Sequence, residues 1–374
     1  MRRLFKTTFV CVVSVITVIL LVSTPLLEKI LSFVFNETKS SENVFEDAWY
    51  FNQLSEIEQE IYLKIATAVS NFDSKVVDVG DKLLSSSHAA SAFEAYLLDN
   101  PGVFYISGAY QITESNFLNV GKIKIKIEYS GNKASIEKNI KLLDQKVERI
   151  VAQTTDVSMT DYEKQLALHD YLVENIRYYD FTNMDEIPSE KHNAYAALVD
   201  NEAVCDGISK AYKLLLNKCN INSVVVTGKM GNKHAWNKVK VEDSWYNVDV
   251  TSDACGKDRV LTHTYFNLSD DEITVTHKFD SMFDTPECTG EKYDYYTYND
   301  FELTNQDFFG DKIKSIVEKS KGKNLEIRVT GNFDIKDIVQ KLYDINFNNY
   351  KVNNVREINY YHVQDVIIVP RIKK

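Results

Sequence analysis

The chain lacks the cysteine and histidine spacings that mark a disulfide scaffold or a zinc site. Its five cysteines are scattered over 374 residues, and no two of them have C-x-x-C spacing. There is also no H-E-x-x-H sequence. We therefore expect no structural metal, no cofactor and no disulfide framework. The cysteines are Cys11, Cys205, Cys219, Cys255 and Cys288.

Excess positive charge is also missing. The chain has 54 acidic and 43 basic residues, which gives a formal net charge of −11. A nucleic-acid partner would require a basic face, so we expect none. The hydrophobic share of 44% and the charged share of 26% are typical of a globular protein. The length favours roughly two or three domains.

The N-terminus carries the one long apolar run. Residues 7–27 are uncharged and mostly apolar, and basic residues precede them in the start 1–6. This order predicts a membrane-inserting helix with the N-terminus in the cytoplasm and the remaining chain outside it. A cleaved signal peptide, giving a secreted protein, is the alternative, although residues 22–26 lack a small-x-small cleavage site.

Helical and strand patterns alternate on both sides of the central third of the chain. Strict alternation in residues 121–129, with lysines on one side, is typical of a strand with one solvated face. Apolar residues at helical spacing predict helices at 53–72, 83–98, 135–151, around 313–317 and at 335–343. Further strands are expected at 103–106, 325–329, near 355–360 and at 366–369.

The chemistry centres on Cys205. Residues 206–219 predict a helix with one apolar stripe, so Cys205 lies at or before the first turn. There the helix dipole and the backbone N–H groups favour the thiolate, which is the nucleophilic form of cysteine. Gly207 would allow close approach of backbone or substrate. Cys219 falls on the apolar stripe, and we expect it to be inert.

A histidine and an aspartate follow on a predicted hairpin. Two alternating runs, 234–241 and 244–250, flank a short polar turn. With a two-residue loop, Asp249 falls opposite Trp236, and His234 is its diagonal neighbour at about 7–8 Å between backbones. A three-residue loop would shift this pairing. Such an aspartate can orient an imidazole and stabilise its charged form.

Each of these residues alone is more often structural than functional. Together, however, Cys205, His234 and Asp249 come in order, each on an element suited to a Cys–His–Asp triad. The blocks 204–212, 233–237 and 245–251 resemble the three signature blocks of the transglutaminase-like superfamily. The similarity runs from about Thr160 to His277, and residues 265–272 resemble a segment that follows the triad in bacterial members.

The resemblance implies a fold like that of papain-like cysteine proteases, in which a cysteine-bearing helix packs on an antiparallel sheet. It also implies that Cys205 is the nucleophile, His234 the general base and acid, and Asp249 the residue that orients His234. Relatives often stabilise the oxyanion with an upstream Trp or Gln. None lies between Gln165 and Cys205, so Tyr195 or Asn193 could substitute, beside the Cys205 N–H. We expect His169 and His192 to be structural.

We therefore expect an α+β fold built from six regions. These are a cytoplasmic start (1–6), a transmembrane anchor or signal (7–27), a linker (28–47), a mostly helical N-terminal α+β region (48–155), a transglutaminase-like core (156–298) and a small C-terminal α/β domain (299–374).

The expected function is that of an extracytoplasmic thiol enzyme acting on peptide or protein amide bonds through a thioester, as a peptidase or deamidase. A protein-crosslinking transglutaminase is the alternative, and a non-catalytic cell-envelope scaffold on the same fold is a second one. The expected partners are a protein or peptide substrate and the membrane.

Overall fold

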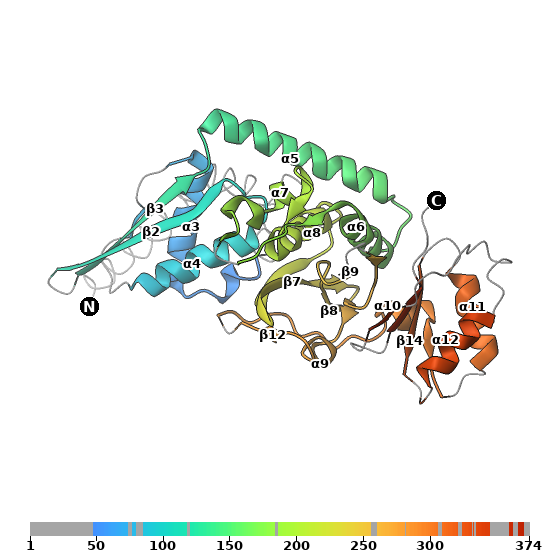
Figure 1. Cartoon of the computed structure of the whole chain (residues 1–374). Coiled ribbons are helices and arrows are strands. Elements are labelled where there is room, and N and C mark those ends of the chain that lie inside the picture. Colours follow the sequence, from blue (N-terminus) through green and yellow to red (C-terminus); the bar gives the residue numbers. More distant parts are fainter. Residues whose placement is uncertain are drawn as a thin grey trace, which may run out of the picture. The chain divides into compact units, whose positions relative to one another are not determined.

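The structure is a computed structural model of the whole chain (Figure 1). It describes residues 48–73, 77–79, 85–117, 120–183, 186–255, 260–280, 282–305, 309–320, 324–330, 332, 334–344, 359–361 and 366–369. Within these ranges no helix is long and apolar enough to cross a membrane. The expected anchor 7–27 and linker 28–47 lie outside the described residues. The chain forms two compact units, 1–138 and 139–374.

In its described residues, the first unit combines two helices with a three-stranded antiparallel sheet. The sheet has the order β1-β3-β2, and its central strand shows the expected alternation. Ile123, Ile125 and Ile127 are buried, while Lys124 and Lys126 are exposed, so the lysines lie on a solvated face. The elements are η1 (Phe51–Gln53), α3 (Glu56–Asn71), β1 (Val77–Val79), α4 (Ser86–Asp99), β2 (Ile106–Phe117) and β3 (Val120–Tyr129), followed by the start of α5 (Lys133–Thr154).

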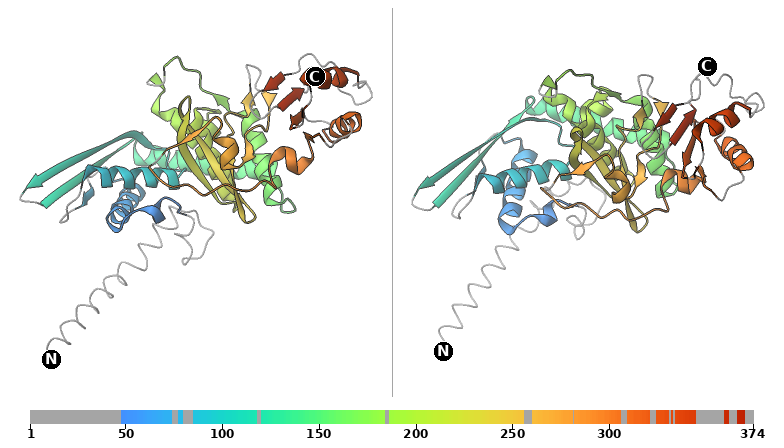
Figure 2. Two further views of the ribbon diagram at one scale, coloured as in Figure 1. Left: turned by 90° about the horizontal axis from the view of Figure 1, so that it is seen from below. Right: turned by 60° about the horizontal axis from the view of Figure 1, so that its bottom comes forward.

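The second unit is built on a five-stranded antiparallel sheet (Figure 2). Its strands, in spatial order, are β11 (Phe266–Leu268), β8 (Ser244–Val248), β7 (Asn232–Val241), β6 (Ser223–Met230) and β12 (Lys278–Phe279). Helix α8 (Cys205–Lys218) packs on β6 and β7, and α6 (Asp161–Asn175) packs on α8. The expected cysteine-bearing helix on an antiparallel sheet, in an α+β fold, is therefore present.

The hairpin of β7 and β8 has the predicted register, in which His234 and Asp249 lie on the same face of the hairpin. Val241 pairs with Ser244 across a two-residue turn, and Glu242 in that turn adopts a positive φ of 53°. Strand β8 ends at Val248, so Asp249 is the first residue after the paired strand.

Short elements surround the sheet. They are β4 (Arg177–Tyr178), η3 (Ser189–His192), α7 (Ala194–Leu198), β5 (Glu202–Ala203), β9 (Ala254–Cys255), β10 (Val260–Leu261), α9 (Asp270–Ile273) and α10 (Tyr295–Asn299). The parallel pair β4–β5 places Tyr178 beside Ala203, two residues before Cys205. This pair thereby brings a distant tyrosine to the start of α8.

The C-terminal segment adds a four-stranded mixed sheet, in the order β13-β14-β16-β15, and two helices. Arg328 on β14 donates to the carboxylates of Asp294 and Glu302. The elements are β13 (Glu302–Leu303), α11 (Phe309–Lys319), β14 (Leu325–Val329), α12 (Ile335–Asp344), β15 (Asn359–Tyr361) and β16 (Val366–Val369). The expected borders at 155 and 298 stay predictions.

Candidate active site

Cys205 is the first residue of α8, at the positive end of the helix dipole. The N-cap residue Val204 has an extended backbone and forms no side-chain cap, so the first-turn N–H groups and the helix dipole act on the cysteine. Gly207 is required here for packing. A Cβ at this position would lie 2.8 Å from the Lys191 carbonyl oxygen and 2.9 Å from the Ala203 Cβ.

His234 joins the thiol to a buried carboxylate. Its Nε2 lies 2.7 Å from Oδ2 of Asp249, and its ring contacts the Cys205 thiol. Burial alone would lower the pKa of His234, but the Asp249 carboxylate and the thiol raise it to about 10. Because an ionised carboxylate only accepts hydrogen bonds, Nε2 carries a proton, and Nδ1 is left to exchange one with the thiol.

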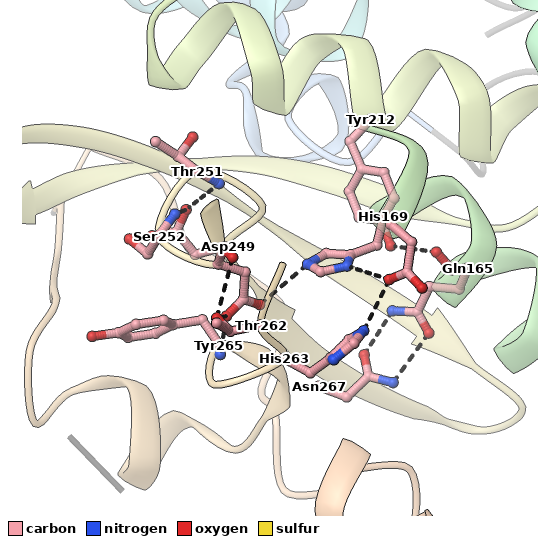
Figure 3. A network of polar contacts seen from close by, with 12 residues as sticks. Gln165, His169, Tyr212, Asp249, Thr251, Ser252, Thr262, His263, Tyr265 and Asn267 are labelled. Carbon is pink, nitrogen blue, oxygen red and sulfur yellow. Dashed lines mark hydrogen bonds and ion pairs between the residues drawn. The ribbon is translucent and has the colours of Figure 1, made fainter. Parts of the chain in front are cut away.

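Asp249 is held from several sides. It is 0% exposed, and its Oδ1 accepts the backbone N–H groups of Thr251 (3.0 Å) and Ser252 (3.1 Å), as Figure 3 shows. Burial alone would raise the pKa of its carboxyl, but His234 and His277 hold that pKa well below the usual range. The carboxylate therefore stays ionised and fixes the orientation of His234.

His277 is a second histidine on the same carboxylate. Its Nε2 lies 3.1 Å from Oδ2 of Asp249, and the Thr276 hydroxyl lies 2.8 Å from its Nδ1. The ring is buried and packs edge-on against Trp236, with 4.9 Å between centroids. Sequence reasoning missed this residue because it lies 28 residues after Asp249, in a segment without a regular pattern.

Tyr178, which the sequence did not single out, lies beside the Cys205 thiol. Burial raises the pKa of its phenol, and the neighbouring Cys205 thiol raises it further, while the Cys205 backbone N–H donates to the phenol oxygen. The N–H expected to bind an oxyanion thus has the phenol as its partner in this state. A strand of two residues, such as β4, has too little periodicity to predict this contact from the sequence.

The two expected oxyanion residues have other contacts. The Asn193 side chain caps α7 by accepting the Ala196 N–H at 3.0 Å, and it donates to the Glu190 carbonyl at 2.9 Å. Tyr195 lies on α7, where burial and the nearby charge of Asp200 raise the pKa of its phenol. Both side chains thus take part in interactions around α7.

The other histidines named from the sequence lie beside carboxylates. His192 Nδ1 lies 2.8 Å from Asp206 at the start of α8. His169 on α6 is fully buried and contacts two carboxylates, those of Asp170 and Asp253, each at 3.1 Å (Figure 3). Burial would lower the pKa of His169, but these carboxylates raise it.

Two of the other cysteines, Cys219 and Cys288, lie in the second unit. Cys219 is half-buried, and burial raises the pKa of its thiol. Cys288 is buried, and the pKa of its thiol is raised in the same way. Both are thiols whose surroundings disfavour the reactive anion.

Comparison with known proteins assigns the core to a class. Residues 148–250 match the family model of the transglutaminase-like superfamily. This part of the chain, which contains Cys205, His234 and Asp249, is therefore a transglutaminase-like core, and the resemblance found in the sequence is confirmed. No curated protein matches the chain.

Three solved structures are similar to parts of the chain. The crystal structure of a TGase has 15% identity and a TM-score of 0.28, covering 48% of this chain and 52% of that one. A candidate cysteine protease from Cytophaga hutchinsonii has 14% identity and a TM-score of 0.24, covering 39% and 63%. A candidate protease from Parabacteroides distasonis has 11% identity and a TM-score of 0.23, covering 38% and 36%. The chain thus spans about half the length of the first structure.

Proposed function

We propose that the protein is a thiol enzyme that attacks amide bonds of peptides or proteins through Cys205, His234 and Asp249. One observation carries this proposal. The imidazole of His234 lies between a thiol at a helix start and a buried, ionised carboxylate. A binding scaffold has no need of that arrangement, whereas acyl transfer requires a nucleophile, a base and a residue that orients the base.

In the proposed reaction the Cys205 thiolate attacks the amide carbon, and the carbonyl oxygen takes up the negative charge. Nδ1 of His234 then donates its proton to the amine nitrogen as the C–N bond breaks, which leaves a thioester on Cys205. Water resolves the thioester, with His234 taking one of its protons, and the products are a carboxylic acid and the free thiol. We favour this hydrolytic course, that of a peptidase or deamidase, over transfer to a lysine amine.

The proposed location rests on the sequence of residues 7–27. We propose that this segment anchors the protein and that the catalytic unit lies outside the cytoplasm. A membrane-impermeant maleimide added to intact cells should label wild type at Cys205, and the Cys205→Ala variant should lose that labelling. Labelling of Cys205 only after the cells are permeabilised would contradict the proposed location.

Thiol reactivity provides the first test of the enzyme proposal. Cys205 and Cys219 are both half-buried, so they form a matched pair within one chain. At mildly acidic pH we expect iodoacetamide to modify Cys205 at least about tenfold faster than Cys219, because only the first is paired with an imidazolium. Equal rates, measured by peptide mass spectrometry, would argue against a catalytic role.

The reaction type is tested by comparing wild type with Cys205→Ala on a panel of protein substrates, using Cys219→Ala as the control. Mass spectrometry distinguishes new peptide ends, a deamidation shift and Gln–Lys crosslinks. We expect new ends or deamidation in wild type and in Cys219→Ala, and neither in Cys205→Ala. Crosslinks would replace the hydrolytic proposal with the transglutaminase one, and no difference between variants would favour the non-catalytic scaffold.

A further inference from the structure

A second group of histidines and carboxylates lies in the same unit, outside the proposed triad (Figure 3). His169 Nδ1 and His263 Nε2 both face Oδ1 of Asp170, at 3.1 Å and 2.9 Å. These three atoms all lie within 4.8 Å of one another. Two imidazole nitrogens and one carboxylate oxygen form the usual three-residue ligand set of a zinc ion that keeps an open position.

The outer nitrogens of the two histidines are also fixed by carboxylates. His169 Nε2 lies 3.1 Å from Asp253, and His263 Nδ1 lies 2.7 Å from Glu326. Histidines that bind metals commonly donate their other ring N–H to a carboxylate, which sets the tautomer and strengthens the ligand. Both histidines have this feature, and in both the free lone pair would point toward Asp170.

The outer carboxylates are rigidly held. Asp253 accepts the Thr262 hydroxyl at 3.0 Å and the Tyr265 N–H at 2.9 Å. Glu326 accepts the Tyr296 hydroxyl at 2.9 Å, and the His263 ring stacks on Tyr295 with 3.7 Å between centroids. The two imidazoles are thus positioned by contacts that do not depend on Asp170.

The charge of this group calls for a cation. Three carboxyl groups, those of Asp170, Asp253 and Glu326, lie against the two histidines. Burying carboxylates is costly unless positive charge compensates them, and a divalent cation would supply that charge. The Asp170 side chain is 23% exposed, which gives an ion a route to the site.

We propose that His169, Asp170 and His263 bind one divalent transition-metal ion, with Zn²⁺ as the reference ion and water in the fourth position. The two nitrogen ligands favour zinc over calcium or magnesium, which prefer sites made of oxygen alone. The ion joins helix α6 to the segment around His263 and, through Glu326, to strand β14. Its role is to stabilise the fold, so the proposal is independent of the proposed function.

Metal binding to the full chain is the direct test. After treatment with a chelator and its removal, the protein should bind one equivalent of Zn²⁺ in calorimetry, and its unfolding midpoint should rise by about 5 °C. Because neutral histidines are the ligands, binding should release protons, and the association constant should rise about tenfold or more per unit over roughly pH 6 to 8. A protein that binds no zinc would be stabilised by two imidazoliums instead, and the proposal would be wrong.

Variants separate this site from the triad. His263→Gln and Asp170→Asn should weaken Zn²⁺ binding at least about tenfold, while the controls Cys205→Ala and His192→Gln should bind it as wild type does. Binding that survives His263→Gln and Asp170→Asn would overturn the assignment. If His263→Gln does not fold, Asp170→Asn and the absorption of Co²⁺-loaded wild type decide the question. Thiolate-to-cobalt bands in that spectrum would place the ion on a cysteine and contradict the proposal.

Discussion

The second unit contains two arrangements in which one carboxylate oxygen faces two imidazoles, and they differ at their outer ends. Around Asp249 the partners are His234 and His277. Around Asp170 they are His169 and His263. In the first arrangement the outer nitrogens meet a thiol and a hydroxyl, and in the second they meet carboxylates.

This difference decides what each arrangement can do. An imidazole with a carboxylate on one side and a thiol on the other can pass a proton, because the thiol gives its proton up and the product is an ion pair. An imidazole with carboxylates on both sides has no such partner. Under the two proposals made above, the same residue types serve catalysis in one place and stability in the other.

Replacing one histidine in each arrangement should give the largest difference between the two. In His234→Gln we expect the catalytic rate to fall by about 10⁴-fold, since the proton carrier is lost, together with a loss of stability because Asp249 loses a partner. In His169→Gln we expect unfolding to become easier by about 3–5 kcal/mol, because buried carboxylates lose a partner. Turnover and denaturant unfolding, measured on both variants, check this. A fall in turnover as large in His169→Gln as in His234→Gln would remove the distinction.

The pH dependence of stability tests the arrangement around Asp249. Below pH 6.5, the ordinary pKa of histidine, His234 is protonated in both the folded and the unfolded chain. The ion pair between His234 and Asp249 then stabilises the fold fully. As pH rises toward its folded pKa of about 10, only the unfolded chain loses the proton, so stability falls. We expect this loss to reach about 3 kcal/mol in wild type and to be mostly absent in Asp249→Asn.

Urea unfolding of both proteins at several pH values measures this difference. Asp270→Asn serves as the control, because it removes another carboxylate of the second unit that is paired with a buried lysine, Lys238. Its pH dependence should stay parallel to that of wild type. Parallel curves for wild type and Asp249→Asn would contradict the pKa assigned to His234.

A substitution of Tyr178 tests the surroundings of the Cys205 thiol. Its phenol contacts both the thiol and the N–H of Cys205, and we expect it to donate to the oxyanion once a substrate carbonyl takes over that N–H. Tyr178→Phe should then lower kcat by about 10²-fold with little change in KM. Tyr179→Phe, whose ring lies under Lys191, is the control. A faster Tyr178→Phe enzyme would show instead that the phenol competes with substrate for the N–H.

In the arrangement around Asp249, local sequence patterns predicted only the residues that lie on or next to regular helices and strands. The apolar stripe placed Cys205 at a helix start, and strand alternation with a two-residue turn placed His234 near Asp249. Tyr178 reaches the site through a two-residue parallel pair, and His277 through an irregular segment. Neither segment is long or regular enough to show a periodic pattern in the sequence.

The arrangement around Asp170 could not be predicted from the sequence for a related reason. Its bridging contact joins residues 93 positions apart, Asp170 and His263, and neither belongs to a spaced ligand motif. The absence of C-x-x-C and H-E-x-x-H therefore excludes only zinc sites made within one short segment. Tertiary packing assembled this group, and its outer carboxylates come from two further parts of the chain, at Asp253 and Glu326.

The smallest expected effect belongs to His277, which acts on the reaction only through Asp249. His277→Phe keeps an aromatic ring against Trp236 but removes the N–H that Asp249 accepts. Losing one buried hydrogen bond to a charged group should lower kcat about tenfold. With one donor fewer, Asp249 attracts the His234 proton more strongly, so the alkaline limb of the rate profile should move to higher pH. Thr276→Val, which removes only the hydroxyl near the outer nitrogen, should shift it less. An unchanged pH profile in His277→Phe would reduce this residue to a packing role.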